Sequence, residues 1–181
     1  MAIEHAIPLL IVTGPVGVGK TTVAYEVSKL LEAVALPHAC IDMDTLRSCY
    51  PAPAGDRFNV ALGLRNLAAV WVNCRATGAT HLIVADVIES REELRGYREA
   101  VPGAAITVVR LRATLSTLTG RVTRREVGSG HDWHLLRAAE LASQMDRDQV
   151  EDAAVETDGR AVTAIAREIV ERSGWVAPVS R

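Results

Sequence analysis

Eight residues near the start of the chain have the types and spacing of a phosphate-binding loop. The run from Gly14 to Thr21 fits the pattern G-x-x-x-x-G-K-[ST]. In such a loop the backbone N–H groups face phosphate oxygens, the lysine adds a full positive charge, and the hydroxyl ligates Mg²⁺. A second hydroxyl, from Thr22, follows directly and suits the α-phosphate. We therefore predict that ATP and Mg²⁺ are bound by Gly14, Pro15, Val16, Gly17, Val18, Gly19, Lys20, Thr21 and Thr22.

Three carboxylates follow apolar runs that read as strands. Asp86 ends the run His81–Asp86, and Asp42 and Asp44 lie at the end of His38–Asp42. Ligands of open α/β sheets bind beyond the carboxyl ends of the strands, so these acids are expected near the loop. Asp86 is predicted to hold Mg²⁺ together with Thr21. Either Asp42 or Asp44 is predicted to accept a proton from an attacking hydroxyl; the alternative role for each carboxylate is capping a helix.

Strands and helices alternate along the whole chain. Apolar runs predict strands at Ile7–Thr13, His38–Asp42, His81–Asp86, Ala105–Leu111 and, more weakly, Ala153–Glu156. Periodicity predicts helices at Thr21–Ala33, Asn59–Arg75, Arg91–Ala100, Thr114–Glu126, His134–Gln149 and Val162–Arg172, of which Arg91–Ala100 reads as charged and exposed. This order predicts an α/β, single-domain P-loop NTPase sandwich over residues 1–181, with a five-stranded, mainly parallel sheet and helices on both faces.

The composition of the chain argues against some classes of binding partner. The chain has 20 basic and 22 acidic residues and a formal charge of -2, a balance that argues against a sequence-independent nucleic-acid binder. No stretch approaches the roughly 20 apolar residues of a membrane span, and the apolar N-terminal run is read as a core strand rather than a signal peptide. Cys40, Cys49 and Cys74 form no C-x-x-C pair and are expected to be reduced thiols in a cytoplasmic protein. The sequence indicates no oligomeric state.

The residues after the second strand extend these expectations, because they resemble a known family. A strand, GPVGVGKTT, a helix and a second strand ending in D-x-D-x-L-R are similar to the small P-loop kinases, which include adenylylsulfate kinase, gluconate kinase, shikimate kinase and chloramphenicol phosphotransferase. Adenylylsulfate kinases carry D-G-D-N-[hydrophobic]-R here. Asp42, Asp44 and Arg47 match that motif, whereas Met43 and Thr45 depart from it.

The same resemblance suggests which acid is the base. Chloramphenicol phosphotransferase has D-S-L at this place, with its Asp acting as the base, and that motif maps onto Asp44-Thr45-Leu46. The resemblance therefore favours Asp44 as the base, with Asp42 as the second candidate.

An arginine-rich segment resembles the lid of such kinases. Leu118-x-x-Arg121-x-x-x-Arg125 is similar to the start of the lid in adenylate-kinase-like and gluconate-kinase-like enzymes, and the i, i+4 spacing puts both arginines on one helix face. The resemblance implies a lid at about residues 114–133, in which Arg121 stacks on the adenine, Arg125 reaches the transferring phosphate and Gly128-Ser129-Gly130 serves as a hinge. The alternative is a solvated charged helix; Arg124 and Arg137 are weaker candidates for the phosphate contact.

The acceptor is expected at about residues 42–65, close to Glu89. Arg47, Asn59 and Arg65 are candidates for holding its polar or anionic groups, and arginine would favour an anionic acceptor. We predict an ATP-dependent kinase that phosphorylates a hydroxyl of a small metabolite or antibiotic. The alternatives are a P-loop ATPase or nucleotide-dependent switch without an acceptor, and a catalytically weak nucleotide-binding module. The sequence contains no guanine-selecting N-K-x-D and no LSGGQ-like signature.

Overall fold

The sheet is parallel throughout. The computed structural model describes residues 6–125 and 131–176. Within them one sheet has the order β2-β3-β1-β4-β5, and all of its pairings are parallel. Its strands are β1 (Ile7–Thr13), β2 (His38–Asp42), β3 (His81–Ala85), β4 (Ala104–Arg112) and β5 (Ala153–Glu156). The predicted α/β sandwich with a mainly parallel, five-stranded sheet is confirmed.

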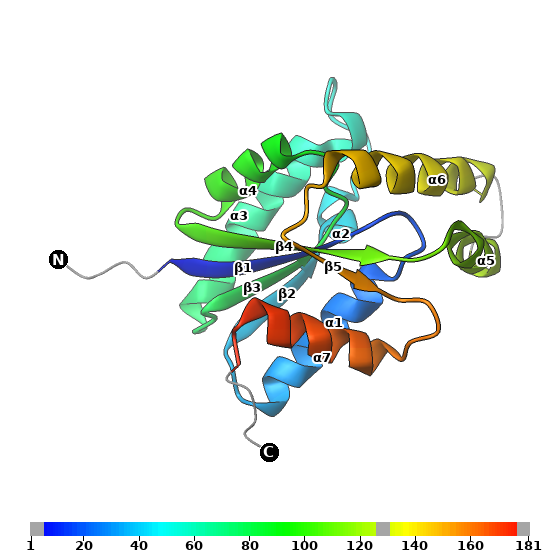
Figure 1. Ribbon diagram of the computed structural model, residues 1–181. Coiled ribbons are helices and arrows are strands. Elements are labelled where there is room, and N and C mark those ends of the chain that lie inside the picture. Colours follow the sequence, from blue (N-terminus) through cyan, green and yellow to red (C-terminus); the bar gives the residue numbers. More distant parts are fainter. Residues whose placement is uncertain (1–5, 126–130, 177–181) are drawn as a thin grey trace, which may run out of the picture.

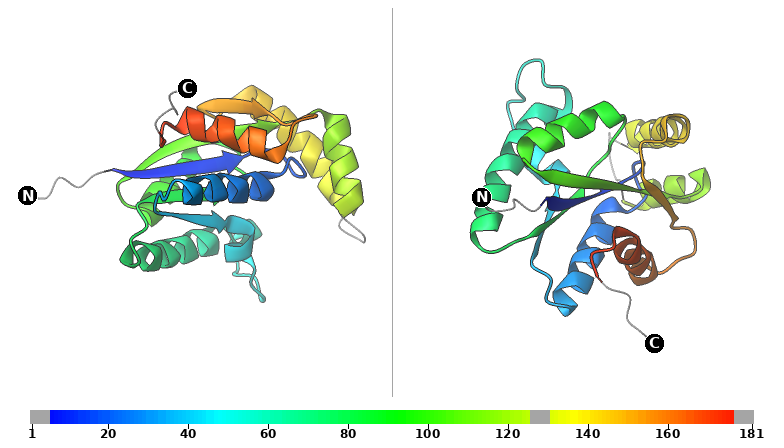
Figure 2. Two further views of the ribbon diagram at one scale, coloured as in Figure 1. Left: turned by 90° about the horizontal axis from the view of Figure 1, so that it is seen from below. Right: turned by 60° about the vertical axis from the view of Figure 1, so that its left-hand side comes forward.

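Helices cover both faces of the sheet (Figures 1 and 2). On one face α1 and α7 lie side by side, and the opposite face carries α3, α4 and α6. The short helix α2 and the helix α5 lie beyond the carboxyl ends of the strands (Figure 1). The bounds are α1 (Lys20–Ala33), α2 (Met43–Arg47), α3 (Val60–Ala76), α4 (Leu94–Ala100), α5 (Leu115–Arg125), α6 (His131–Asp148) and α7 (Val162–Ser173), with 3-10 turns η1 (Arg57–Asn59) and η2 (Arg91–Glu93).

The central strand β1 supplies both hydrophobic cores. Successive side chains of a strand point to opposite faces, and every second residue of β1 enters the same core. Leu9 and Ile11 pack with Leu67 and Trp71 of α3 and with residues of α4. Leu10 and Val12 pack with the buried faces of α1 and α7. Because it is buried on both faces, β1 reads in the sequence as a continuous apolar run.

The segment Arg91–Ala100 differs from its prediction as a charged, exposed helix. It consists of the turn η2 followed by α4, and Leu94, Tyr97 and Ala100 of α4 are buried against the sheet. The prediction was wrong because these residues recur at i, i+3 and i+6, a stripe that the many charges around it obscured. The predicted hinge at Gly128–Gly130 lies outside the described residues. None of the helices in the described ranges has the length and apolar content that a membrane crossing needs.

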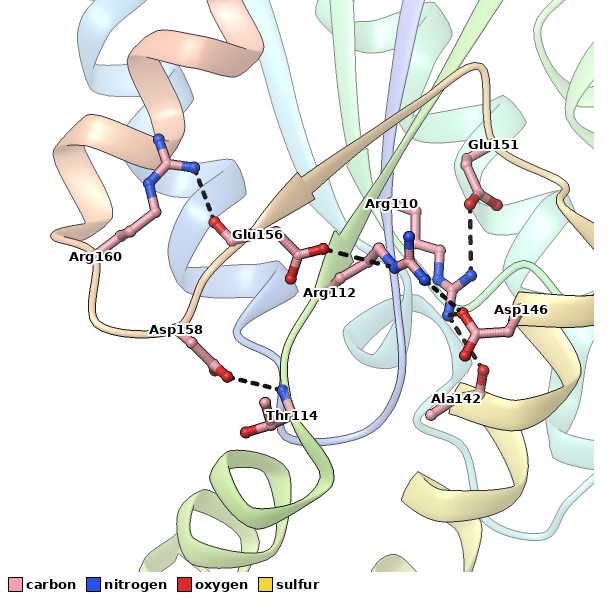
Figure 3. A network of polar contacts seen from close by, with 9 residues as sticks. All are labelled: Arg110, Arg112, Thr114, Ala142, Asp146, Glu151, Glu156, Asp158 and Arg160. Carbon is pink, nitrogen blue, oxygen red and sulfur yellow. Dashed lines mark hydrogen bonds and ion pairs between the residues drawn. The ribbon is translucent and has the colours of Figure 1, made fainter.

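A buried arginine fastens α6 to the sheet (Figure 3). The Arg110 side chain, on β4, is only 4% exposed, and its guanidinium donates to Asp146 at 2.8 Å and to the carbonyl of Ala142 at 3.2 Å. Glu151 lies 3.4 Å away on its other side. The neighbouring Arg112 also donates to Asp146, at 3.0 Å, but its side chain is 43% exposed. Since a buried charge must be compensated, Arg110 fixes the end of α6 over β4.

These two arginines allow a matched test of stability. We expect Arg110→Gln to lower the free energy of unfolding by about 2–3 kcal/mol, because it removes charged partners from a buried network. Arg112→Gln, which alters an exposed ion pair with the same carboxylate, should cost less than about 1 kcal/mol. Urea denaturation of both variants measures the difference. Equal losses would show that burial of Arg110 is not what stabilises this contact.

Candidate active site

The loop between β1 and α1 leaves the N-terminus of α1 open to an anion. Gly19 adopts a left-handed conformation just before the helix, no described side chain caps its first amides, and its first turn contains no acidic residue. The helix dipole and the N–H groups of this first turn therefore favour a phosphate at this position. The ammonium of Lys20 folds over the loop and donates to the carbonyls of Gly14 at 3.1 Å and Pro15 at 3.3 Å. These contacts hold its charge at the mouth of the loop.

The loop is shaped by glycine at a point where another helix approaches closely. Gly17 has φ +81°, and a Cβ built there would lie 2.8 Å from Cγ2 of Val122 and 3.3 Å from the carbonyl oxygen of Leu118. Both of these residues belong to α5, the first helix of the predicted lid segment. Because Gly17 has no side chain, α5 packs directly on the phosphate loop.

Asp42 joins the loop to the end of β2. Its Oδ2 accepts a hydrogen bond from the Thr21 hydroxyl at 2.7 Å, and its Oδ1 accepts one from the backbone N–H of Asp44 at 2.9 Å. Asp42 is therefore the N-cap of α2. The chain turns into α2 directly after Asp42. Asp44 is therefore not at the end of the strand, where it was predicted, but is an exposed residue of the first turn of α2.

Asp86 is buried in an ion pair instead of facing Thr21. Arg47 donates to both of its oxygens, at 2.8 Å and 2.5 Å, and the hydroxyl of Tyr97 donates to Oδ2 as well. Burial is the largest single influence on the pKa of Arg47 and acts to lower it. The charge and the hydrogen bond of Asp86, together with Tyr97 and Asp44, nevertheless raise the pKa, so the guanidinium stays charged. Burial raises the pKa of Tyr97 well above its usual value and the charge of Asp86 adds to this, so the phenol keeps its proton.

This arrangement bears on two predicted roles. With both oxygens of Asp86 engaged, the geometry does not favour Asp86 as the partner of Thr21 in binding Mg²⁺; Asp42 is the carboxylate that contacts Thr21. Arg47, expected to hold the acceptor, is instead paired with Asp86. Tyr97 was not found by sequence reasoning, since nothing in its local spacing indicates a hydrogen bond to Asp86.

The other predicted acceptor residues are spread over three elements. The side-chain amide of Asn59 donates to the carbonyl of Arg47 at 2.8 Å and so supports α2. Arg65 is exposed on α3, where its charge adds to the backbone hydrogen bonds that lower the pKa of Asp56. Glu89 pairs with Arg137 of α6, which ties the loop after β3 to that helix. The structure therefore brings Arg47 and Asn59 together and leaves Arg65 apart from them.

Arg121 lies at the junction of the loop and the last strand. Its Nη1 donates to the carbonyl of Val18 at 2.9 Å and to the hydroxyl of Thr157 at 3.2 Å, just after β5. Arg121 thus connects the phosphate loop with the residue that follows β5. Arg125 ends α5, and its side chain lies outside the described residues.

Comparisons with known proteins agree with this architecture. A protein-family model described as an AAA domain matches residues 10–154. Among solved structures, a gluconokinase from Sinorhizobium meliloti is 22% identical with a TM-score of 0.62, and the match covers 94% of each chain. A tunicamycin resistance protein from Deinococcus radiodurans is 18% identical with a TM-score of 0.65, over 93% of this chain and 96% of that one.

A third similar structure is the APS kinase of Mycobacterium tuberculosis in complex with AMPPNP and APS. It is 22% identical with a TM-score of 0.61, over 93% of this chain and 98% of that one. No curated protein matches the sequence significantly. At these identities the structural likeness shows the fold, which is that of the small P-loop kinases the sequence resembles.

The lysine of the loop gives the first test of the site. Lys20→Ala removes the full positive charge at the phosphates, so we expect ATP affinity to fall by more than tenfold, about 1.4 kcal/mol or above, and turnover to be lost. Lys29→Ala is the matched control, because Lys29 is the other lysine of the chain and its exposed side chain pairs only weakly with Glu26. Fluorescence titration with an ATP analogue measures both. Unchanged affinity in Lys20→Ala would remove the phosphate-loop assignment.

The contact between the loop and α5 gives a second test. Gly17→Ala strains a left-handed residue and forces Val122 away, so we expect at least a tenfold loss of nucleotide affinity. Gly120→Ala is the control within α5, since a Cβ there meets nothing within 4 Å and alanine favours the helix. Isothermal titration of both variants with ATP compares them. Equal ATP affinity in the two variants would show that nucleotide binding does not require the close packing of α5 on Gly17.

Proposed function

The chain belongs to the AAA-domain family, and we propose that it is an ATP-dependent kinase that transfers the γ-phosphoryl group to a hydroxyl of a small molecule. One observation carries the proposal: the hydrogen bond of 2.7 Å from Thr21 to Asp42 brings the tip of β2 against the phosphate loop. A second, exposed carboxylate, Asp44, lies two residues further along, in the first turn of α2. A carboxylate at this place can accept the proton of an acceptor hydroxyl during phosphoryl transfer. Similar folds in a gluconokinase and an APS kinase support this reading.

Nucleotide binding is assigned to the loop and to α5. The backbone and hydroxyls of residues 14–22 surround the phosphates, and Lys20 neutralises the β- and γ-phosphates. Arg121, held between Val18 and Thr157, is placed to contact the base or the phosphates from the α5 side. Arg125 remains the candidate for charge stabilisation of the transferring group, as the resemblance implies.

The residues present fit a magnesium ion at the loop. The Thr21 hydroxyl and the Asp42 carboxylate lie in hydrogen-bonding contact, and both are the hard oxygen ligands that Mg²⁺ prefers. Mg²⁺ typically takes one or two protein ligands and completes its shell with water and substrate phosphates. When bound, it supplies positive charge to the phosphate oxygens. We assign its protein ligands to Thr21 and Asp42 in place of Thr21 and Asp86.

Asp44 is the proposed base. The acceptor oxygen bonds to the γ-phosphorus while the bond from that phosphorus to the β–γ bridging oxygen breaks, so ADP leaves. The proton of the acceptor hydroxyl passes to the carboxylate of Asp44. Asp42 is less suited to this role, since its two oxygens already accept from Thr21 and from the N–H of Asp44. Asp44 is exposed in the first turn of α2.

The two aspartates are expected to respond differently to the same substitution. Asp44→Asn should keep ATP affinity within a few fold and lower phosphoryl transfer by about 10² to 10⁴, the usual contribution of a base. Asp42→Asn should weaken the Mg²⁺ dependence of ATP binding, because the carboxylate beside Thr21 loses its charge. Titration with ATP at varied Mg²⁺, paired with transfer assays over pooled metabolites and aminoglycoside- or phenicol-type antibiotics, separates the two.

Each variant serves as the control for the other. Transfer at the parent rate in both would exclude a base at the tip of β2. Turnover of ATP that no acceptor accelerates above hydrolysis by water would replace the kinase with an ATPase.

A further inference from the structure

The arginines on the acceptor side of the candidate site are already neutralised by carboxylates of the same chain. Arg47 and Arg137 approach the region between α2, the start of α3 and the loop after β3. Arg47 is paired in two hydrogen bonds with Asp86. Arg137 pairs with Glu89 and lies 3.5 Å from Glu140 as well. Each guanidinium therefore has a resident carboxylate.

Arg47 cannot leave its partner at little cost. The side chain of Asp86 is 1% exposed and that of Arg47 is 16% exposed, so an Arg47 that turned toward an acceptor would leave Asp86 charged and buried. Loss of one partner of a buried pair is strongly destabilising, because the other charge stays buried without compensation. The surroundings of Arg47 also restrict it. Gly63 of α3 packs so closely that a Cβ at that position would lie 2.7 Å from Cγ of Arg47.

Further acids lie on the same side. Asp44 is exposed at the start of α2. Glu93 accepts a hydrogen bond from the backbone N–H of Glu89 at 3.2 Å. Burial raises the pKa of Glu93, and the negative charges of Glu89 and Asp86 add to this. Around α2 and the loop after β3, the carboxylates of Asp42, Asp44, Asp86, Glu89 and Glu93 thus accompany Arg47 and Arg137, and Arg65 on α3 adds one exposed positive charge.

We infer that the acceptor is a hydroxylated small molecule that carries no negative charge, either a neutral polyol or an amino alcohol. The inference rests on the proposed kinase function and deepens it. An anionic acceptor would have to displace Asp86 or Glu89 from an arginine or approach the exposed carboxylate of Asp44, and like charges brought together disfavour binding. A neutral hydroxyl compound meets hydrogen-bond acceptors, and an ammonium group meets favourable charge. This reverses the expectation of an anionic acceptor that the arginines suggested in the sequence.

Matched acceptors test the inference directly. Sorbitol is compared with gluconate and methyl shikimate with shikimate, since the members of each pair differ by a carboxylate, and glucosamine serves as the cationic probe. Transfer from γ-labelled ATP to each compound gives kcat/KM. We expect kcat/KM to be at least tenfold higher for the member of each pair without a carboxylate. Comparing glucosamine with sorbitol shows whether a cationic or a neutral acceptor is preferred.

A variant tests whether the resident carboxylates set this preference. Glu89→Gln leaves Arg137 without its closest acid, so the ratio of kcat/KM between the uncharged and the carboxylate member of each pair should fall at least threefold. Glu92→Gln changes the net charge equally at an exposed neighbouring position and should leave the ratio unaltered.

The outcomes distinguish the inference from the function beneath it. Preference for the carboxylate members would overturn the inference and leave the kinase intact. An unchanged ratio in Glu89→Gln would overturn the role given to the resident ion pair. Transfer to no member of the panel, with ATP bound normally, would count against the kinase and the acceptor class together.

Discussion

The buried carboxylate of Asp86 constrains the side of this protein on which the acceptor is proposed to bind. It stands just after β3, the strand next to β1, where solvent does not reach it. A charge in that position requires counter-charge and hydrogen bonds, and the chain supplies Arg47 from α2 and Tyr97 from α4. Two helices that are far apart in sequence are thereby fixed at one point. The placement of α2, and through Asn59 the start of α3, follows from satisfying this single group.

The nucleotide half depends on close backbone packing instead of charge. The absence of a side chain at Gly17 lets α5 rest on the phosphate loop, and Arg121 of the same helix reaches back to the loop carbonyl of Val18. On the far side, Arg110 fastens α6 to β4. Two successive helices are therefore held in place by different contacts: α5 packs on the phosphate loop, and α6 is bound to strand β4.

Asp42 connects the two halves. One of its oxygens holds the Thr21 hydroxyl of the loop and the other caps α2, so the phosphate site and the acceptor region share one side chain. The electrostatic potential differs between the two sides of Asp42. Lys20, Arg121 and the N-terminus of α1 make the nucleotide side positive, whereas the acceptor side is rich in carboxylates with neutralised arginines. Such a division suits a reaction that joins a highly anionic donor to an acceptor without negative charge.

The sequence by itself determined the phosphate loop and the succession of strands and helices along the described residues, except for the short helix α2. Periodicity and the pattern from Gly14 to Thr21 are local properties of the chain, and short-range spacing encodes them fully. Only the tertiary structure decided which acid meets Thr21, what neutralises Asp86 and which face of α4 is buried. Those outcomes depend on pairs such as Arg47–Asp86 and Arg137–Glu89, whose members are 39 and 48 residues apart. Such partners come together only in the folded chain, where a buried charge requires a counter-charge, so local sequence patterns do not predict them.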